Sequence, residues 1–402
     1  MKIVIAPNAF KGSLSSTRVA NSIEQGIKKV FNNVEIEKIP LADGGDGTLE
    51  VLLRAKGGKI YKKRVKGPLW DEIDAEYGIL EDGTAVIEMA KASGLALLSE
   101  EKRNPLYTTT YGTGELILDA LDKGAKRIII GVGGSATCDG GIGSLAALGS
   151  KFLDANGKEV KPVGENLKLI RNVQLNKKLE KINTIVACDV LNSLLGEHGA
   201  ARVYAPQKGA SNHEVKILEE GLEHFSSLTP KGLRIRGTPM TGAAGGLSFG
   251  LALIGAKLRL GAELIMEMVD FNERAMYADL MITGEGKMDR ATSYGKVSYA
   301  VMQFGKRNNI PVIGITGSIG RDIDELYDQG LTTLFSLAPG PIDLDKSMRD
   351  APKLIENVAE RIARMLSINK SHVASGFIPN VNEFHVVRGF PYGPNGQSRK
   401  KE

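Results

Sequence analysis

The chain has 402 residues, of which 42% are hydrophobic and 25% are charged, a composition typical of a folded globular protein and unlike that of a disordered one. At roughly 100–200 residues per domain, the length predicts about two or three domains. A net charge of only +5 is too small to indicate nucleic acid as the main partner. The two cysteines, Cys138 and Cys188, exclude a disulfide framework and fit a reducing compartment.

The apolar stretches are too short for a membrane protein. The one at the start of the chain is too short for a signal-peptide core and predicts a buried strand. The longest, at 243–256, is interrupted by Ser248 and by four glycines, and it is shorter than the roughly 20 residues that a span needs. We therefore expect a cytoplasmic protein without a membrane partner.

Strand-like apolar runs alternate with helix-like patterns along the chain. The first two strands are expected at 2–6 and 34–39, and the helix between them begins at Ser15 with apolar residues on one face. The last third of the chain repeats this alternation, with strands at 278–283, 311–316 and 332–337 and helices at 297–306, 322–329 and 344–366. Such alternation predicts a parallel sheet with helices on both faces.

The distribution of these elements predicts the domain organisation of an α/β protein. The first two and the last three strands form one flavodoxin-like, doubly wound parallel sheet with strand order 2-1-3-4-5, in a discontinuous domain of residues 1–66 plus 278–367. Residues 67–277 then form a second α/β domain inserted into the first, with strands expected at 75–79, 85–89, 127–132 and 184–188. Residues 368–402, rich in Asn, Gly and Pro, predict a mobile C-terminal tail.

The strongest local signal is the sequence GVGGSATCDGGIG at 131–143, directly after an apolar run. Glycines let backbone N–H groups converge on an anion without a Cβ in the way. The pattern that follows is helical, so the loop lies at a helix N-terminus, where a phosphate is favoured. Ser135 and Thr137 add hydroxyl donors, and Asp139 repels an anion unless Mg²⁺ or a transferable proton lies between them. This combination indicates nucleotide phosphates with a metal; the alternative is a tight turn whose glycines serve only packing.

Three further polar segments follow predicted strands. The sequence LADGGDGT at 41–48 carries Asp43 and Asp46, whose oxygens suit a hard cation, although Asp46 is equally suited to cap the next helix. The sequence TGEGKMDR at 283–290 is expected to meet residues 8–13 in the crevice where the strand order reverses. Asp189 also follows a strand-like run, a position where an Asp is about as often a turn or cap residue.

Several common chemistries are missing from the sequence. It contains no G-x-x-x-x-G-K-[ST] string and no protein-kinase HRD or DFG string, and its five histidines are scattered. A P-loop, a His–Ser triad and a zinc site are therefore not predicted. The remaining carboxylates, amides and cations suit phosphoryl transfer, in which an enzyme positions phosphates, holds Mg²⁺ on oxygens and supplies a base. A ligand-binding regulator and a nicotinamide enzyme are less favoured, because no DNA-binding pattern and no convincing dinucleotide fingerprint is present.

Nine motifs in order make the sequence recognisable: IAPNAFKGSLS (5–15), PLADGGDGT (40–48), RNPLYTTTYGTGEL (103–116), GVGGSATCDGG (131–141), CDVLNSLLG (188–196), VYAPQKGA (203–210), GAAGGL (242–247), ITGEGKMD (282–289) and GKVS (295–298). Together they resemble the bacterial type-one glycerate kinase family, often called glycerate 2-kinases, over roughly residues 1–367. The resemblance implies ATP-dependent phosphorylation of D-glycerate, usually at the 2-hydroxyl to give 2-phosphoglycerate, with Mg²⁺. It also implies a flavodoxin-like domain carrying an inserted α/β domain. The runner-up is a kinase for hydroxypyruvate or tartronate, and we expect a monomer or a homodimer.

Glycerate is small and anionic, so its carboxylate needs cationic or N–H donors and its hydroxyl needs a nearby base. The residues with these chemistries at the motif positions are Asp189 and Lys11 as catalytic residues; Ser13, Arg103, Asp289 and Lys296 as substrate-binding residues; Gly133, Gly134, Ser135, Thr137, Gly284 and Glu285 for the nucleotide phosphates; and Asp43 and Asp139 for the metal. The alternative for each charged residue is a solvated surface ion pair worth under about 1 kcal/mol.

Overall fold

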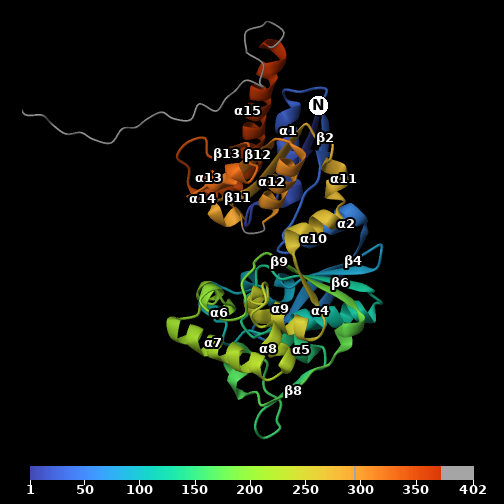
Figure 1. Ribbon diagram of the computed structural model, residues 1–402, viewed down its shortest axis with the longest axis vertical. Helices are drawn as coiled ribbons and strands as arrows, with labels where there is room; N and C mark the ends of the chain where they lie inside the picture. The colour runs from blue at the N-terminus through green and yellow to red at the C-terminus, as the bar shows by residue number, and fades with distance from the viewer. Residues whose placement is uncertain (294–295, 373–402) are drawn as a thin grey trace, which may run out of the picture.

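The computed structural model describes residues 1–293 and 296–372. Two sheets, each with helices packed against it, follow one another along the longest axis of the molecule (Figure 1). The mobile tail expected at 368–402 lies, from residue 373 on, outside the described residues, and residues 368–372 form the end of the last helix. Gly295, in the last of the nine motifs, also lies outside them.

One sheet is built from the two ends of the chain. Its strands are β1 (Lys2–Ile5), β2 (Glu35–Lys38), β11 (Leu280–Met288), β12 (Val312–Ile319) and β13 (Thr333–Ser336). They pair in the order β2-β1-β11-β12-β13, and every pair is parallel. This is the order 2-1-3-4-5 expected from the sequence, so the prediction of a doubly wound α/β sheet is confirmed.

The middle of the chain forms a second, mixed sheet. Its strands are β3 (Gly58–Lys66), β4 (Glu72–Leu80), β5 (Thr84–Glu88), β6 (Arg127–Gly131), β9 (Asn183–Cys188) and β10 (Lys257–Leu260). The order is β10-β9-β6-β5-β4-β3, in which β3 and β4 form an antiparallel edge and the other strands are parallel. A short ribbon of β7 (Lys151–Leu153) and β8 (Asn172–Gln174) lies apart from it.

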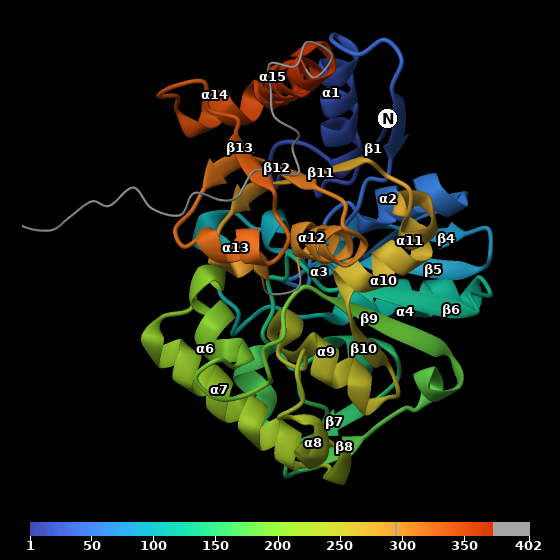
Figure 2. The ribbon, with the colours of Figure 1, turned by 45° about the horizontal axis from the view of Figure 1, so that its top comes forward.

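The α-helices cover both sheets. In chain order they are α1 (Ser16–Lys28), α2 (Thr48–Lys56), α3 (Ala90–Ser93), α4 (Tyr111–Asp122), α5 (Ile142–Ala147), α6 (Ala200–Tyr204), α7 (Asn212–Ser227), α8 (Pro230–Ile235), α9 (Ala243–Leu253), α10 (Gly261–Met268), α11 (Phe271–Ala275), α12 (Val297–Asn308), α13 (Asp324–Asp328), α14 (Leu344–Arg349) and α15 (Ala351–His372). Helices α1 and α15 lie side by side on one face of the five-stranded sheet (Figures 1 and 2). Their backbones approach so closely that a Cβ on Gly26 would lie 2.2 Å from the carbonyl oxygen of Glu356.

Two elements differ from the sequence-based expectation. The helix expected at 344–366 is broken at Asp350 into α14 and α15. Pro352 has no N–H to donate to the carbonyl of Met348, which accepts a 2.6 Å hydrogen bond from the Ser13 hydroxyl instead. The segment expected as a loop at 283–290 is mostly strand, because β11 continues to pair with β12 after β1 has ended.

The two sheets share part of their hydrophobic core. Val4 of β1 belongs to the same buried cluster as Val86 of β5 and Ile185 of β9, together with Leu52 of α2 and Ile265 of α10. Helices α2 and α10 also lie between the two sheets in Figure 1. Strand β3 lies in the range expected for the first domain but pairs with the six-stranded sheet. Where the boundary between the two units lies stays a prediction.

Two further observations concern the cysteines and the helices of the described residues. Cys138 and Cys188 are both buried and form no disulfide. Among residues 1–293 and 296–372, no helix combines the length and the apolar character needed to cross a membrane.

Candidate functional site

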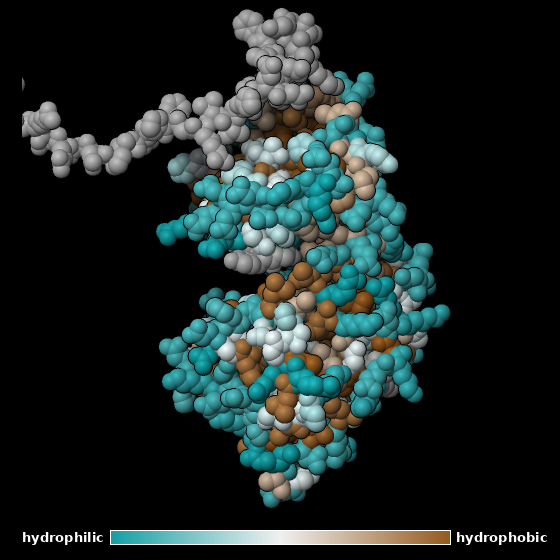
Figure 3. All heavy atoms as spheres, in the orientation of Figure 1, coloured by the Kyte–Doolittle hydropathy of each residue, from teal (hydrophilic) through white to brown (hydrophobic). Residues whose placement is uncertain are grey.

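The carboxyl ends of strands from both sheets meet in one region. In an open parallel sheet this edge binds ligands, at the point where the strand order reverses. Here that point lies between β1 and β11, and a cavity of about 380 Å³ opens there. Residues that follow β1 line it together with Asp43, Glu285 of β11 and Lys296 at the start of α12. The space-filling view shows the surface hollowed where the two parts of the molecule meet (Figure 3).

Lys11 lies among carboxylates that come from both sheets. It keeps solvent contact, and nearby negative charges, Asp43 first and then Asp189, Asp46 and Glu285, raise its pKa although its partial burial opposes them. Asp189, at the end of β9, has a raised pKa because it is withdrawn from water and lies near Asp43; Lys11 and Lys296 oppose that rise. The structure therefore brings together Lys11 and Asp189, which the sequence predicted as catalytic residues.

Hydrogen bonds hold the carboxylates of this region in place. The side-chain amide of Asn8 donates to Asp43 Oδ2 at 3.1 Å, and the N–H of Gly45 donates to Oδ1 at 3.2 Å. Glu285 is 6% exposed and pairs with Lys296, whose Nζ lies 3.2 Å from Oε2. Burial raises the pKa of Glu285, and the nearby Lys296 opposes this.

Glycines allow the Asp43 loop to reach the second sheet. The N–H of Gly133, after β6, donates to the carbonyl of Gly44 at 3.3 Å. A Cβ on Gly133 would lie 2.7 Å from the Cα of Gly45, and one on Gly261 would lie 1.9 Å from the carbonyl oxygen of Asp43. No larger residue fits at either position without moving backbone. The two glycines therefore allow the Asp43 loop to approach the end of β6 and the start of α10 closely.

Glu88 is a further residue that positions this loop, and the sequence analysis missed it. It is buried at the end of β5, and its Oε1 accepts a 2.9 Å hydrogen bond from the N–H of Leu49 in the first turn of α2. Burial raises its pKa, and this hydrogen bond opposes the rise. A carboxylate at a helix N-terminus compensates unpaired N–H groups. Glu88 thus fastens the helix that follows the Asp43 loop to the six-stranded sheet.

The glycine-rich loop at 131–143 has its hydroxyls turned inward. Ser135 is 8% exposed and Thr137 is not exposed, whereas Gly134 is exposed. The buried Lys208 donates from Nζ to Ser135 Oγ and to the Thr137 carbonyl, both at 2.7 Å. Sequence reasoning missed Lys208, although it lies in the motif VYAPQKGA, because a single lysine in a short loop has no chemical pattern of its own.

Because Lys208 is buried, we expect the free energy of unfolding to depend on pH. Burial lowers its pKa from 10.5 to about 8, so between these pH values the unfolded chain binds a proton that the folded protein does not. Stability then rises with pH across this window. Relative to Lys208→Met, we expect the wild-type free energy of unfolding to increase by up to about 3 kcal/mol from pH 8 to pH 10.5, measured by urea titration.

The control for this prediction is Lys257→Met, which removes an exposed lysine. Its free energy of unfolding should follow that of the wild type at every pH. Parallel pH profiles of the wild type and Lys208→Met would show that Lys208 keeps its proton in the folded protein.

Asp139, which the sequence predicted as a metal ligand, is not among the residues that line the cavity. Its side chain is not exposed. Oδ2 accepts hydrogen bonds from the N–H and the hydroxyl of Thr110, both at 2.8 Å, and from the N–H of Gly143, while Oδ1 accepts one from the N–H of Gly141. Through these hydrogen bonds the buried carboxylate joins the glycine-rich loop to the start of α4.

Most of the remaining predicted residues line one of two cavities. Ser13 and Lys296 line the first cavity, although the Ser13 hydroxyl is used by Met348, and Asp289 pairs with Lys287 at 2.8 Å. Arg103 lines a separate cavity of about 630 Å³ together with Gly134 and Asp46. Asp46, which lines this second cavity, also contributes to the raised pKa of Lys11, which lines the first. Gly284 lies in β11, beside Glu285.

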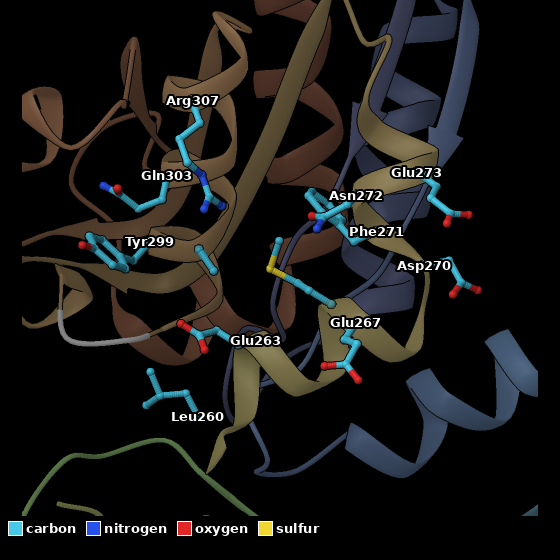
Figure 4. A pocket seen from close by; sticks show the side chains of 12 residues that line it. Leu260, Glu263, Glu267, Asp270, Phe271, Asn272, Glu273, Tyr299, Gln303 and Arg307 are labelled. Atoms are coloured by element: carbon cyan, nitrogen blue, oxygen red, sulfur yellow. The ribbon is translucent and has the colours of Figure 1, made fainter.

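A larger cavity, of about 800 Å³, lies elsewhere. Figure 4 shows its lining side chains, which come mainly from α10, α11 and α12, among them Glu263, Phe271 and Arg307. None of the residues predicted as site residues lines it. Volume alone is therefore a poor guide here, and we place the candidate site at the strand ends, where the charged groups converge.

Comparison with known proteins identifies the family. The model of the family described as "Glycerate kinase family" matches residues 3–367. The chain belongs to the glycerate kinase family. It is therefore a kinase, as the nine motifs predicted.

Relatives match the chain over nearly their whole length. "Glycerate kinase" of Bacillus subtilis (strain 168) is 45% identical and "Glycerate 2-kinase" of Escherichia coli (strain K12) is 42% identical; each alignment covers 92% of this chain, and 99% and 98% of the relative. The crystal structure of the putative glycerate kinase 2 from Salmonella typhimurium LT2 aligns with a TM-score of 0.79 at 40% identity, over 92% of this chain and 99% of that one. The predicted fold class and family are thereby confirmed.

Proposed function

We propose that this kinase transfers the γ-phosphoryl group of ATP to the 2-hydroxyl of D-glycerate, with Mg²⁺ as cofactor, to give 2-phosphoglycerate and ADP. The relatives named above support glycerate as the acceptor. The observation that carries the proposal is the convergence of Lys11 with Asp43, Asp189 and Glu285 between the two sheets. Phosphoryl transfer needs cations for the phosphates, oxygen ligands for the metal and a base for the hydroxyl, and these residue types supply all three.

Asp189 is our candidate for the base. Burial and the neighbouring charge of Asp43 raise its pKa, so its carboxylate attracts a proton more strongly than an ordinary Asp does. As the glycerate hydroxyl oxygen attacks the γ-phosphorus, the bond to the bridging oxygen of ADP breaks and the hydroxyl proton passes to Asp189. A base aligned in this way accelerates transfer by about 10²–10⁴-fold.

The residues present fit a Mg²⁺ ion that is shared with the nucleotide. Among the described residues, no group of three or more His, Cys, Asp or Glu side chains is placed to hold a metal ion. Mg²⁺ at kinase sites commonly uses one or two carboxylates, with substrate phosphates and water completing the shell. Asp43, oriented by Asn8, and Glu285 are the carboxylates that line the cavity and would hold the ion. When bound, Mg²⁺ neutralises phosphate charge.

The cations are divided between the two substrates. Lys11 and Lys296 line the first cavity and are suited to the phosphate oxygens. Arg103 lines the neighbouring cavity, where its guanidinium would bind the carboxylate of glycerate. The exposed Gly134 lines the same cavity as Arg103 and leaves the backbone open to a small ligand. Arg103 keeps the role expected from the sequence, whereas Lys296, expected there to bind the substrate, and Lys11, expected there to be catalytic, are here assigned to the phosphates.

The direct test incubates the purified protein with D-glycerate and Mg-ATP and identifies the product by phosphorus NMR. We expect 2-phosphoglycerate, and ADP release that depends on D-glycerate. Hydroxypyruvate and tartronate serve as alternative acceptors in the same assay. Faster ADP release with either of them would contradict the proposed substrate, and a 3-phosphoglycerate product would contradict the proposed position.

The proposal also covers the domain organisation, the compartment and the oligomeric state of the protein. We propose that residues 67–277 form an inserted domain, so that the site lies between this domain and the flavodoxin-like one. We also propose that the enzyme works in the cytoplasm as a monomer or a homodimer.

A further inference from the structure

The cavity between β1 and β11 is lined by polar and by apolar side chains, and the strand order separates them: Asp43 follows β2 at one edge of the sheet and Leu337 follows β13 at the other, so we call these the polar end and the apolar end. The polar end carries Lys11, Asp43, Glu285 and Lys296, which the proposed function uses. The other end is lined by apolar side chains from the segment after β1, the end of β13, α14 and the start of α15: Phe10, Leu337, Leu344, Met348 and Ala351. A three-carbon hydroxy acid has no apolar surface that needs such a lining.

The apolar end contains buried core side chains and one exposed side chain at its rim. Phe10, Leu337 and Ala351 belong to the buried core and are at most 4% exposed, so they provide a fixed floor. Leu344 of α14 stands at the rim and is 72% exposed. The hydrogen bond from Ser13 to the Met348 carbonyl ties α14 to the segment that carries Lys11. An apolar side chain exposed at the rim of an apolar pocket gains free energy when a ligand covers it.

The size and charge of the cavity select the ligand. Its volume of about 380 Å³ is in the range of pockets that enclose drug-sized molecules, of about 300–1,000 Å³, and far exceeds what glycerate fills. Three lysines line it: Lys11, Lys287 and Lys296. Cations at one end and an apolar slot at the other match a molecule with a polyphosphate and a flat aromatic base.

We propose that the base of the nucleotide binds against Phe10, Leu344 and Met348, with its phosphates extending toward Lys11 and Lys296. This inference rests on the proposed function and assigns each substrate its own cavity: the nucleotide binds on the side of the five-stranded sheet, and the acid binds beside Arg103 and Gly134. Of the two hydroxyls that the sequence assigned to phosphates, that of Ser135 accepts a hydrogen bond from the buried Lys208, and that of Thr137 is buried.

The test compares ATP with inorganic tripolyphosphate, which has a phosphate chain but no base. Both are titrated by calorimetry against the full chain in Mg²⁺, without glycerate. The variant is Leu344→Gln, which removes apolar surface at an exposed position and adds no charge. We expect it to raise the Kd of ATP about fivefold, the equivalent of losing part of a leucine contact, and to leave the Kd of tripolyphosphate unchanged.

The matched control is Leu97→Gln. Leu97 is also an exposed leucine, but it lines the cavity of Arg103. We expect it to bind ATP as the wild type does. If Leu97→Gln weakens ATP binding and Leu344→Gln does not, the base lies in the other cavity and the inference is overturned. Equal weakening of ATP and tripolyphosphate by Leu344→Gln also overturns it, because the base would then make no contribution.

Failure of the inference differs from failure of the proposed function. If the wild type phosphorylates glycerate while Leu344→Gln binds ATP normally, the function stands and the location of the base is wrong. If the wild type phosphorylates no glycerate while Leu344→Gln shows the base-specific loss, the location stands and the acceptor is wrong. A wild type that binds neither ATP nor tripolyphosphate overturns both.

Discussion

Replacing Asp189 by asparagine will lower kcat by about 10²–10⁴-fold and leave KM for D-glycerate within a few-fold of the wild-type value. The amide keeps the shape of the carboxylate but accepts no proton, and proton removal matters in the transition state far more than in the bound ground state. Steady-state kinetics with ADP release as the readout measures both constants. Turnover within a few-fold of the wild type would remove Asp189 from the role of base.

The pH dependence separates a base from a merely structural carboxylate. A base must be deprotonated to act, so kcat/KM falls as pH decreases through its pKa. Because the pKa of Asp189 is raised, we expect this acid limb above the value of about 3.9 that is usual for Asp. In Asp189→Asn the limb should be absent from the residual activity. A structural role would lower the whole profile and leave its shape unchanged.

Replacing Lys11 by methionine will lower kcat/KM by about 10²-fold or more. The substitution removes a cation that faces Asp43, Asp189 and Glu285 and that we assign to the phosphates. Loss of one donor aimed at developing charge typically costs about 10²–10³-fold. Lys11→Arg, which keeps the charge, should recover part of the rate.

The same variant should also shift the acid limb. Lys11 lowers the pKa of Asp189 by favouring its charged form, so its removal raises that pKa and moves the limb to higher pH. Lys287→Met is the matched control, because Lys287 lines the same cavity but pairs with Asp289 at 2.8 Å. It should alter KM for ATP without moving the limb. An acid limb that stays in place in Lys11→Met would show that Lys11 and Asp189 do not interact.

The strand ends explain why part of the site could be predicted. A parallel sheet places the residues that follow its strands at one edge. Once the order 2-1-3-4-5 was inferred, Lys11 and Glu285 had to lie near one another, and the structure places both in one cavity. Asp43, after β2, joins them there. Hydrophobic periodicity and strand order can be inferred from one amino-acid sequence, because they depend on the local pattern of residues and on the order of the elements along the chain.

The direction of buried side chains could not be predicted in this way. Ser135 and Thr137 appeared to be phosphate ligands because hydroxyls in a glycine-rich loop suit an anion. In the structure the Ser135 hydroxyl accepts from Lys208, which is more than seventy residues away in the chain and also donates to the backbone carbonyl of Thr137. The sequence likewise predicted Asp139 as a metal ligand. It could not show that Thr110, at the start of α4, donates two hydrogen bonds to this carboxylate. No sequence pattern indicated the role of Glu88, because its partner is the backbone N–H of Leu49 in a helix distant in the chain.

The sequence alone determined the α/β class, the strand order of the five-stranded sheet and the family, because these follow from hydrophobic periodicity and from motifs read in order. The tertiary structure decided which charged residues share a cavity and which are enclosed. It also showed that the cavity has an apolar end. Helix α14, which the break at Asp350 separates from α15, contributes side chains to that end. The physical reason is that burial and hydrogen bonding depend on partners distant in the chain, and these partners are defined only when the two sheets pack together.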